Sequence, residues 1–177
     1  MADIPYGGLN IRRLNHRSRV SSFCCSEDDL NDFIKNDALI AHSNMTSRTY
    51  LCYLNGIVVG FATLAAATIE VKSVEDQPIE GYTPKTYPCI KLARFAVDKN
   101  YEGKGIGPYL LRWVMGKFYQ ISDEIGCRYI TVDSKKRSMW FYEKHDFILV
   151  EKTRNKLHPT FYLDMCDEGD GTTESSS

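Results

Sequence analysis

The sequence predicts an α/β domain whose sheet begins as an antiparallel meander. Apolar runs of strand length alternate with helical patterns, and an Asn55-Gly56 pair between two of these runs is typical of a type I′ hairpin. The length of 177 residues suits one domain, and 43% apolar and 25% charged residues are typical of globular proteins. No apolar run approaches a membrane span and no signal-peptide pattern follows Met1, so we expect a cytoplasmic protein without membrane contact.

The first half of the chain supplies strands and one early helix. Residues 9–14 are expected to form a short strand, and residues 49–54 and 57–69 the two strands of the hairpin. Ser26 and Asp29 have the spacing of a capping box, which predicts a helix start. This helix presents one apolar face, made by Leu30, Phe33, Ile34 and Ala38.

Residues 72–88 interrupt the strands. They contain Pro78, Pro84 and Pro88 together with Gly81. This composition predicts an irregular surface excursion, which we expect to help form a substrate site.

An apolar strand at residues 92–97 leads through a glycine loop directly into a helix. Gly103, Gly105 and Gly107 alternate in this loop, so several backbone N–H groups can converge on phosphate oxygens at the positive end of the helix. Pro108 fits the first helical turn, where a missing N–H costs nothing. The arrangement predicts a pyrophosphate site, and a tight turn with glycines for geometry alone is the alternative.

The helix after this loop is predicted to start at Ile106 and to end near Gly126. Its apolar residues are three, four or seven positions apart and give one buried face, made by Ile106, Leu110, Trp113, Val114, Ile121 and Ile125. The remaining expected elements are a strand, a short helix and two further strands, at residues 128–133, 138–144, 147–151 and 160–165.

The spacing of the glycines disagrees with two common phosphate loops. A Walker A loop needs a glycine where this chain has Asp98, and Ser or Thr where it has Gly105. A dinucleotide fingerprint needs Gly-x-Gly-x-x-Gly, and the last spacing here is one residue too short. A nucleotide-binding regulatory domain is therefore disfavoured.

Two segments of the loop region carry a resemblance to a known family. Arg94-Phe-Ala-Val-Asp followed by Tyr101-Glu-Gly-Lys-Gly-Ile-Gly resembles the acyl-CoA-binding signature of the GNAT N-acetyltransferase superfamily, (Gln/Arg)-x-x-Gly-x-(Gly/Ala). Glu102 occupies the Gln/Arg position. Because a carboxylate beside phosphates is unfavourable, we expect Glu102 to face solvent.

A second match lies at residues 132–147, which resemble the strand and short helix that carry a Phe-Tyr pair in this family. The pair here is Phe141-Tyr142. Lys135 replaces the frequent Asn, and Asp146 replaces the usual Gly at the turn into the next strand. Asp tolerates the backbone conformation that such a turn requires.

The resemblance covers residues 9–165 and implies the GNAT fold, a mixed, mostly antiparallel sheet with a splayed central strand pair and flanking helices. We expect an acetyltransferase domain at residues 9–166 and an acidic, Ser-rich disordered tail at residues 167–177. The tail holds four of the 23 acidic residues and none of the 22 basic ones, so residues 1–166 carry a formal charge of +3. This mild basicity neither requires nor excludes a nucleic-acid substrate.

The resemblance further implies an N-acetyltransferase that moves an acetyl group from acetyl-CoA directly to a primary amine. The splayed strand would bind the pantetheine amides and the loop would bind the pyrophosphate. The cofactor-binding residues implied are Phe95, Ala96, Val97, Gly103, Lys104, Gly105, Ile106, Gly107 and Pro108. Tyr142 is the expected general acid, because a phenol with an unperturbed pKa of about 10 is protonated and can supply the departing thiolate.

The group that accepts the amine proton is left open by the sequence. Glu70, Asp98 and His145 are candidates by residue type, and a water-mediated route is an equal alternative. The basic run at residues 135–137 could neutralise a phosphate of the cofactor or of RNA. A solvated helix start is the favoured interpretation of this run.

The acceptor is expected to be a small-molecule or protein amine. The alternative is a toxin that acetylates the amino group of aminoacyl-tRNA, because residues 23–34 resemble the start of such toxins. Cys25-Ser26 stands where those toxins carry Cys-Gly or Ser-Gly, and they are commonly more basic, so tRNA is the less favoured partner. A homodimer is left open. A non-catalytic acyl-CoA-binding module is the alternative from another class, and Tyr142 argues against it.

The six cysteines show no metal-ligand spacing, so no metal site is expected. Cys24 and Cys25 are adjacent. The others occur singly in apolar segments, as buried reduced thiols do, at Cys52, Cys89, Cys127 and Cys166.

Overall fold

A seven-stranded sheet forms the centre of the molecule in the computed structural model, which describes residues 6–75, 81–82 and 84–166. The strand order is β1-β2-β3-β4-β5-β7-β6. All neighbours are antiparallel except β4 and β5, which are parallel, so the predicted mixed sheet is confirmed. The strands are β1 (Leu9–Arg13), β2 (Arg48–Leu54), β3 (Ile57–Glu70), β4 (Thr86–Val97), β5 (Tyr129–Asp133), β6 (Ile148–Leu149) and β7 (Thr160–Asp164).

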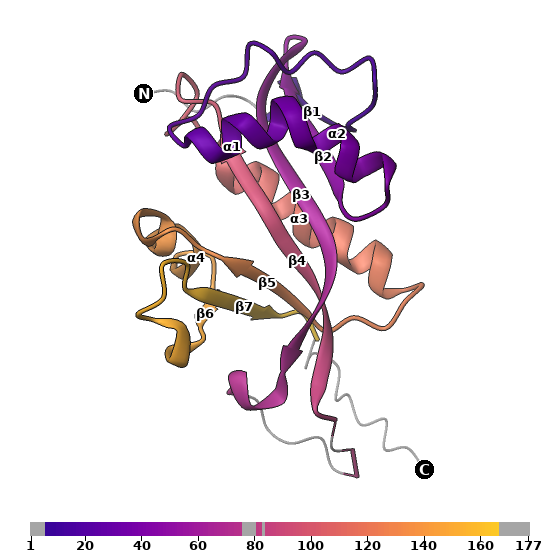
Figure 1. Cartoon of the computed structure of the whole chain (residues 1–177), viewed down its shortest axis with the longest axis vertical. Coiled ribbons are helices and arrows are strands. Elements are labelled where there is room, and N and C mark those ends of the chain that lie inside the picture. Colours follow the sequence, from indigo (N-terminus) through magenta and orange to yellow (C-terminus); the bar gives the residue numbers. More distant parts are fainter. Residues whose placement is uncertain (1–5, 76–80, 83, 167–177) are drawn as a thin grey trace, which may run out of the picture.

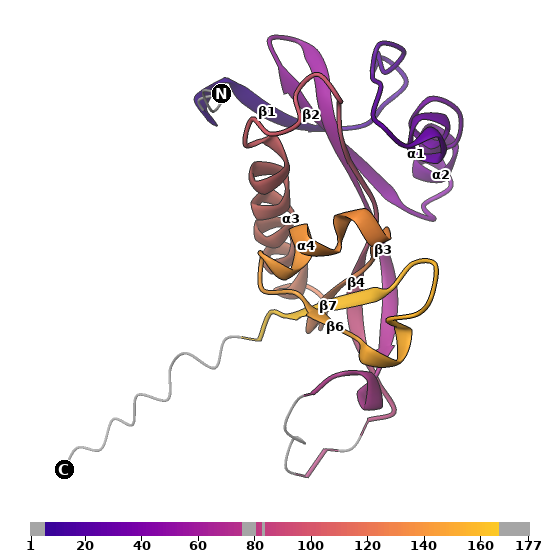
Figure 2. The ribbon, with the colours of Figure 1, turned by 90° about the vertical axis from the view of Figure 1, so that its left-hand side faces the viewer.

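Helices cover both faces of this sheet (Figures 1 and 2). They are α1 (Asp28–Asp32), α2 (Ala38–Ser43), α3 (Ile106–Ser122) and α4 (Met139–Glu143). α3 and α4 share one apolar core with β3, β4 and β5, whereas the α1–α2 segment packs on the other face against Phe61 and Ala96. Among the described helices, none is long and apolar enough to cross a membrane.

The hairpin between β2 and β3 has the predicted geometry. Asn55 and Gly56 both have positive φ, 50° and 79°, as a type I′ turn requires. The turn sets the register that pairs Leu54 with Ile57. Asp146 likewise has φ of 65°, which confirms that Asp replaces glycine in that turn without blocking it.

β4 and β5 diverge, and this divergence creates the site described below. The two strands pair only from Cys89 to Leu92 of β4. Beyond Leu92, β4 continues to Val97 while pairing with β3 alone among the described strands. Ala93 is an extra residue in the β3–β4 register, a β-bulge that bends β4 where it leaves β5. The splayed strand pair expected from the family resemblance is thus present.

Two predicted details of the helices are wrong. The early helix begins at Asp28 with Glu27 at its N-cap and has no side-chain cap, because Asp29 instead pairs with Lys135. Its apolar face is nevertheless buried as expected, through α1, a π-helical turn (Phe33–Asp37) and α2. α3 ends at Ser122 rather than near Gly126. The structure therefore leaves Ile125 outside the helix and 67% exposed.

The predicted irregular segment at residues 72–88 is shorter than expected. β4 starts at Thr86, so Pro88 lies inside a strand. Its missing N–H is tolerated there because Pro88 is exposed and precedes the part of β4 that pairs with β5. Val71–Ser73 form a short 3-10 turn at the same end of the sheet. Pro78 lies outside the described residues, as does the tail predicted at residues 167–177.

All six cysteines are free thiols. Cys25, Cys52 and Cys89 are buried, and burial raises the pKa of the Cys52 thiol to about 12. Cys24 and Cys127 are half-buried. Cys166 is exposed, so the prediction of a buried thiol is wrong there, because β7 has already ended at Asp164.

Candidate functional site

A cleft of about 960 Å³ opens where β4 and β5 diverge. Five parts of the chain line it, namely the start of α1, the end of β4 with the glycine loop, the turn after β5, α4 with the residues that follow it, and the loop before β7. The free edge of β4 beyond Leu92 forms one wall, so its backbone groups are available to an extended ligand, as at any open strand edge. An extended chain carrying amides fits this wall.

The glycine loop lies at the N-terminus of α3, which is the positive end of that helix. Gly103 and Gly105 have φ of 69° and 82°, a conformation that disfavours other residues, and Gly105 is the N-cap. Within the described residues, the amides of Gly103, Gly105 and Gly107 donate to no backbone carbonyl. These amides are therefore free to bind an anion.

The third glycine has a different role, which is to let α4 approach the loop. A Cβ on Gly107 would lie 3.4 Å from the Phe141 ring. Phe141 also packs on Phe95 of β4, with ring centroids 5.8 Å apart. Close packing at Gly107 therefore brings α4 against the cleft.

Most of the predicted cofactor-binding residues line the cleft. They are Phe95, Ala96, Val97, Gly103, Gly105, Gly107 and Pro108. The side chains of the other two point elsewhere. Ile106 is 1% exposed in the core, and Lys104 donates to the Asn100 carbonyl at 2.8 Å and lies over the Tyr101 ring. Ile106 and Lys104 can therefore contribute only their backbone amides, and not their side chains, to binding a ligand in the cleft.

Tyr142 lines the cleft from α4 and is 5% exposed. Its ring packs between Phe147 and Phe161, at centroid distances of 5.5 and 6.2 Å. Burial raises the pKa of this phenol above its usual value, so it is protonated at neutral pH. No hydrogen bond to its hydroxyl occurs among the described residues, which leaves the proton available to a ligand.

Of the three candidate bases, one lines the cleft and two do not. Glu70 lies at the distal end of β3, exposed and paired with Lys72 and Lys152, so it is remote from the cleft. Asp98 is 4% exposed and is not among the lining residues. His145 lines the cleft, and its Nδ1–H donates to the Phe141 carbonyl at 2.7 Å. In the neutral ring this bond leaves Nε2 as the free acceptor.

Asp98 instead anchors the N-terminal segment to the end of β4. Its carboxylate accepts from the Cys24 amide at 2.9 Å and from the backbone and side chain of Asn100. The Lys99 amide donates to the Cys24 carbonyl at 2.9 Å beside it. The segment that leads into α1 is thereby held beside the glycine loop.

We expect Asp98→Asn to lower stability without changing chemistry. Removing the charge weakens bonds that contribute about 1.5–3 kcal/mol when one partner is ionised, so the melting temperature should fall. The kcat of the folded enzyme should stay within about twofold and keep its pH profile, because the group lies outside the cleft. Thermal unfolding and a pH–rate profile check this, and a loss of the acidic limb of the profile would make Asp98 the proton acceptor.

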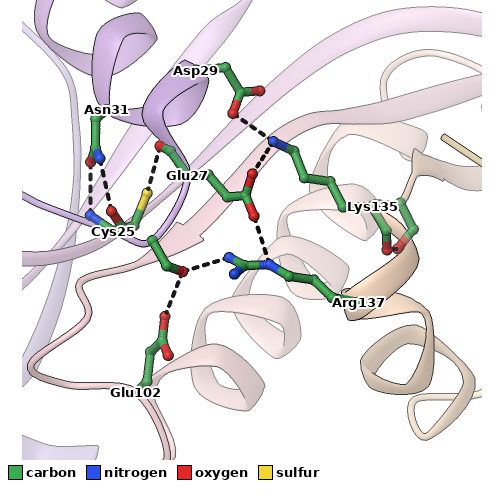
Figure 3. Close-up of polar contacts among 9 residues, drawn as sticks. Cys25, Glu27, Asp29, Asn31, Glu102, Lys135 and Arg137 are labelled. Carbon is green, nitrogen blue, oxygen red and sulfur yellow. Dashed lines mark hydrogen bonds and ion pairs between the residues drawn. The ribbon is translucent and has the colours of Figure 1, made fainter. Parts of the chain in front are cut away.

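A network of ion pairs and hydrogen bonds joins residues at the start of α1 to residues that follow β5, and all of them line the cleft (Figure 3). Lys135 contacts both Glu27 and Asp29, the latter at 2.6 Å, and Arg137 Nε lies 2.7 Å from Glu27. The Arg137 guanidinium also donates to Ser26 Oγ at 2.5 Å. The predicted solvated helix start is therefore wrong for Lys135, whose side chain is only 27% exposed between two carboxylates, whereas Arg137 lies in a short helix and is 55% exposed while it also pairs with Glu27.

These contacts perturb the charged groups that make them. The hydrogen bond from Lys135 lowers the pKa of the Asp29 carboxyl. Burial disfavours the Lys135 charge, but its bonds to Asp29 and Glu27 outweigh this effect and raise the pKa of the ammonium. Asp29 and Lys135 are thus charged at neutral pH. Glu102 is exposed, as predicted, but it also lines the cleft and accepts from Ser26 Oγ at 3.4 Å.

The described part of the segment at residues 72–88 takes no part in the cleft. None of its described residues is among the lining residues. The paired ends of β3 and β4 carry it away from the glycine loop, since Glu70 pairs with Thr86 at that end (Figure 1). The prediction that this segment contributes to the site is wrong for its described part.

A parallel strand pair that splays apart, a glycine loop at a helix N-terminus and a buried tyrosine line one cleft, and this arrangement is the one expected of an acyl-CoA-dependent acyltransferase. The family comparison agrees, because the Acetyltransferase (GNAT) domain model matches residues 46–149. The chain belongs to the GNAT acetyltransferase family, and acetyl-CoA is its acyl donor.

A curated relative and several solved structures resemble the chain. A protein of Mycobacterium tuberculosis described as a tRNA-acetylating toxin is 34% identical over 137 residues, which are 77% of this chain and 82% of the relative. The structure of AtaT complexed with acetyl-methionyl-tRNAfMet has a TM-score of 0.76 at 22% identity and covers 88% of this chain and 94% of that chain. The crystal structure of a KacT mutant has a TM-score of 0.79 at 22% identity, covering 89% of this chain and 95% of that chain. The two structural matches establish a shared fold.

Proposed function

We propose that this protein acetylates the α-amino group of aminoacyl-tRNA and thereby acts as a toxin that stops translation. The observation that carries the proposal is the 34% identity, over most of both chains, to a tRNA-acetylating toxin. From sequence patterns alone a small-molecule or protein amine was favoured. Small-molecule, protein and aminoacyl-tRNA acceptors all present a primary amine. The identity to a tRNA-acetylating toxin favours the amine that is carried by tRNA.

The donor half of the site follows from the cleft. The free amides of Gly103, Gly105 and Gly107 bind the pyrophosphate of acetyl-CoA, and the open edge of β4 bonds the pantetheine amides as a missing strand would. This arrangement brings the thioester to the point where β4 and β5 part. Tyr142 lines the same cleft from α4.

The transfer requires two proton movements. The neutral amine attacks the thioester carbonyl, the C–N bond forms, and the C–S bond of the tetrahedral intermediate breaks to release the CoA thiolate. Tyr142 gives its proton to the leaving sulfur, and the amine proton passes to His145 Nε2, directly or through water. An α-amino group has a pKa of about 8, so a mild base such as imidazole is sufficient at neutral pH.

The rim of the cleft has features that suit an RNA acceptor. Trp140 on α4 is 63% exposed beside the cleft, and Lys144 and His158 also line this region. An exposed indole can stack on a nucleobase, and the nearby lysine attracts the phosphate backbone. These features support the proposal beyond sequence identity.

A growth and translation assay tests the proposed toxicity. Expression of the wild type is expected to arrest bacterial growth, and the purified protein should inhibit a translation extract only when acetyl-CoA is present. Tyr142→Phe made to the same level should do neither, because transfer depends on its proton. Normal growth and translation with abundant, folded wild type would exclude the toxin function.

A further inference from the structure

Glu27, Asp29, Lys135 and Arg137 form a bridge across the mouth of the cleft, and it joins parts of the chain that are far apart in sequence. Lys135 lies 108 and 106 positions from its two carboxylate partners, and Arg137 lies 111 positions from Ser26. One end belongs to the start of α1, which packs on one face of the sheet. The other end belongs to the turn between β5 and α4, on the far side of the splay (Figure 3).

We propose that this bridge selects polyanionic acceptors, because it opens when phosphate groups replace the carboxylates on Lys135 and Arg137. The inference rests on the proposed function, since it concerns how an aminoacyl-tRNA, rather than a small amine, reaches the thioester. Glu27 and Asp29 are the specificity-determining residues in this account. Lys135 and Arg137 are the groups that change partner.

The charges explain why the reactive form of a small amine does not open the bridge. The neutral amine that attacks the thioester carries no charge, so it cannot take the place of a carboxylate beside Lys135 or Arg137. A phosphate can, because guanidinium and phosphate form two parallel charge-assisted hydrogen bonds. The side chains of Lys135 and Glu27 are 27% and 21% exposed, so their pair is screened less than a surface ion pair.

The bridge is not needed to hold the N-terminal segment in place. Cys24 is fixed by its bonds to Asp98 and Lys99. Cys25 and Asn31 exchange two hydrogen bonds of 2.8 Å, which lock the turn into α1. Loss of the ion pairs should therefore free the mouth of the cleft while leaving both walls folded.

Two double variants test the proposal from opposite ends of the bridge. Glu27→Gln with Asp29→Asn removes the carboxylates, and Lys135→Gln with Arg137→Gln removes the cations. Each is assayed with acetyl-CoA and two acceptors that present the same amine, an aminoacyl-tRNA and the methyl ester of the same amino acid. Glu151→Gln breaks an exposed ion pair with Arg154 outside the cleft and serves as the matched control.

Both double variants should raise kcat/KM for the methyl ester by about tenfold, because either one opens the bridge. For aminoacyl-tRNA the two should differ. The carboxylate variant should equal or exceed the wild type, and the cation variant should fall by about tenfold, with a weaker salt dependence. Glu151→Gln should leave both acceptors unchanged.

An unchanged or undetectable rate with the methyl ester in both variants would overturn the proposal, as would parallel losses on both acceptors. The outcome for the proposed function is separate. If wild type and variants transfer no acetyl group to any aminoacyl-tRNA, the proposed function fails, and the ester rates alone still decide whether the bridge controls access.

Discussion

Tyr142→Phe lowers kcat for acetyl transfer by about 100-fold, while the dissociation constant for acetyl-CoA stays within about threefold of wild type. The hydroxyl is in the cleft and keeps its proton because burial raises its pKa. Without this hydroxyl, the CoA sulfur must leave as an unprotonated thiolate. The ring itself packs between Phe147 and Phe161, and those contacts are retained in the variant. Steady-state kinetics with thiol detection and equilibrium binding of acetyl-CoA measure the two quantities.

Tyr129→Phe is the matched control for this experiment. Tyr129 is 0% exposed, its hydroxyl has no hydrogen-bond partner within the described residues, and it lies in a separate apolar cluster away from the cleft. Removing that hydroxyl should leave kcat unchanged and should not lower stability, because no bond is lost. Equal turnover in Tyr142→Phe and wild type would exclude Tyr142 as the general acid.

Gly103→Asp raises the dissociation constant for acetyl-CoA by about 30-fold or more. A carboxylate about 4 Å from a phosphate at the protein surface is repelled by up to about 4 kcal/mol, and screening still leaves about 2 kcal/mol. Nothing lies within 4 Å of the position that a Cβ would take, so the side chain fits without a clash. Its φ of 69° adds strain of about 1 kcal/mol, which lowers stability slightly. Isothermal titration with acetyl-CoA measures the loss.

Gly56→Asp makes the same change at a comparable position outside the cleft. Gly56 also has positive φ, 79°, and open space around the Cβ position. It should lose a similar amount of stability and bind acetyl-CoA like the wild type. If Gly103→Asp also binds like the wild type, the pyrophosphate does not lie on the glycine loop.

Local patterns predicted most of the fold because local interactions determine those elements. The Asn55-Gly56 turn, the strands beside it and the start of α3 depend on residues that are neighbours in sequence. The prediction placed the start of β4 too late for the opposite reason. Pairing with Glu70 extends β4 back to Thr86 through Pro88, and no local signal reveals that pairing.

The donor half of the candidate site was predictable in the same way, since Gly103 and Gly105 need only their own backbone conformation. The bridge was not predictable. Ser26 and Asp29 have the sequence of a helix cap, but the side chains meet Arg137 and Lys135 instead, and tertiary proximity overrides the local preference. The opposite charges of residues 27–29 and 135–137 were visible in the sequence, and only their spatial pairing was hidden.

The most direct measurement is the chemical fate of the acetyl group. Purified protein is incubated with labelled acetyl-CoA and a mixture of aminoacyl-tRNAs, uncharged tRNA, free amino acids and a basic peptide, and the products are separated after nuclease digestion and identified by mass spectrometry. The expected result is label on the α-amino group of aminoacyl-adenosine and a loss of that product in Tyr142→Phe. Label on the free amino acids or the peptide, with none on aminoacyl-adenosine, would contradict it.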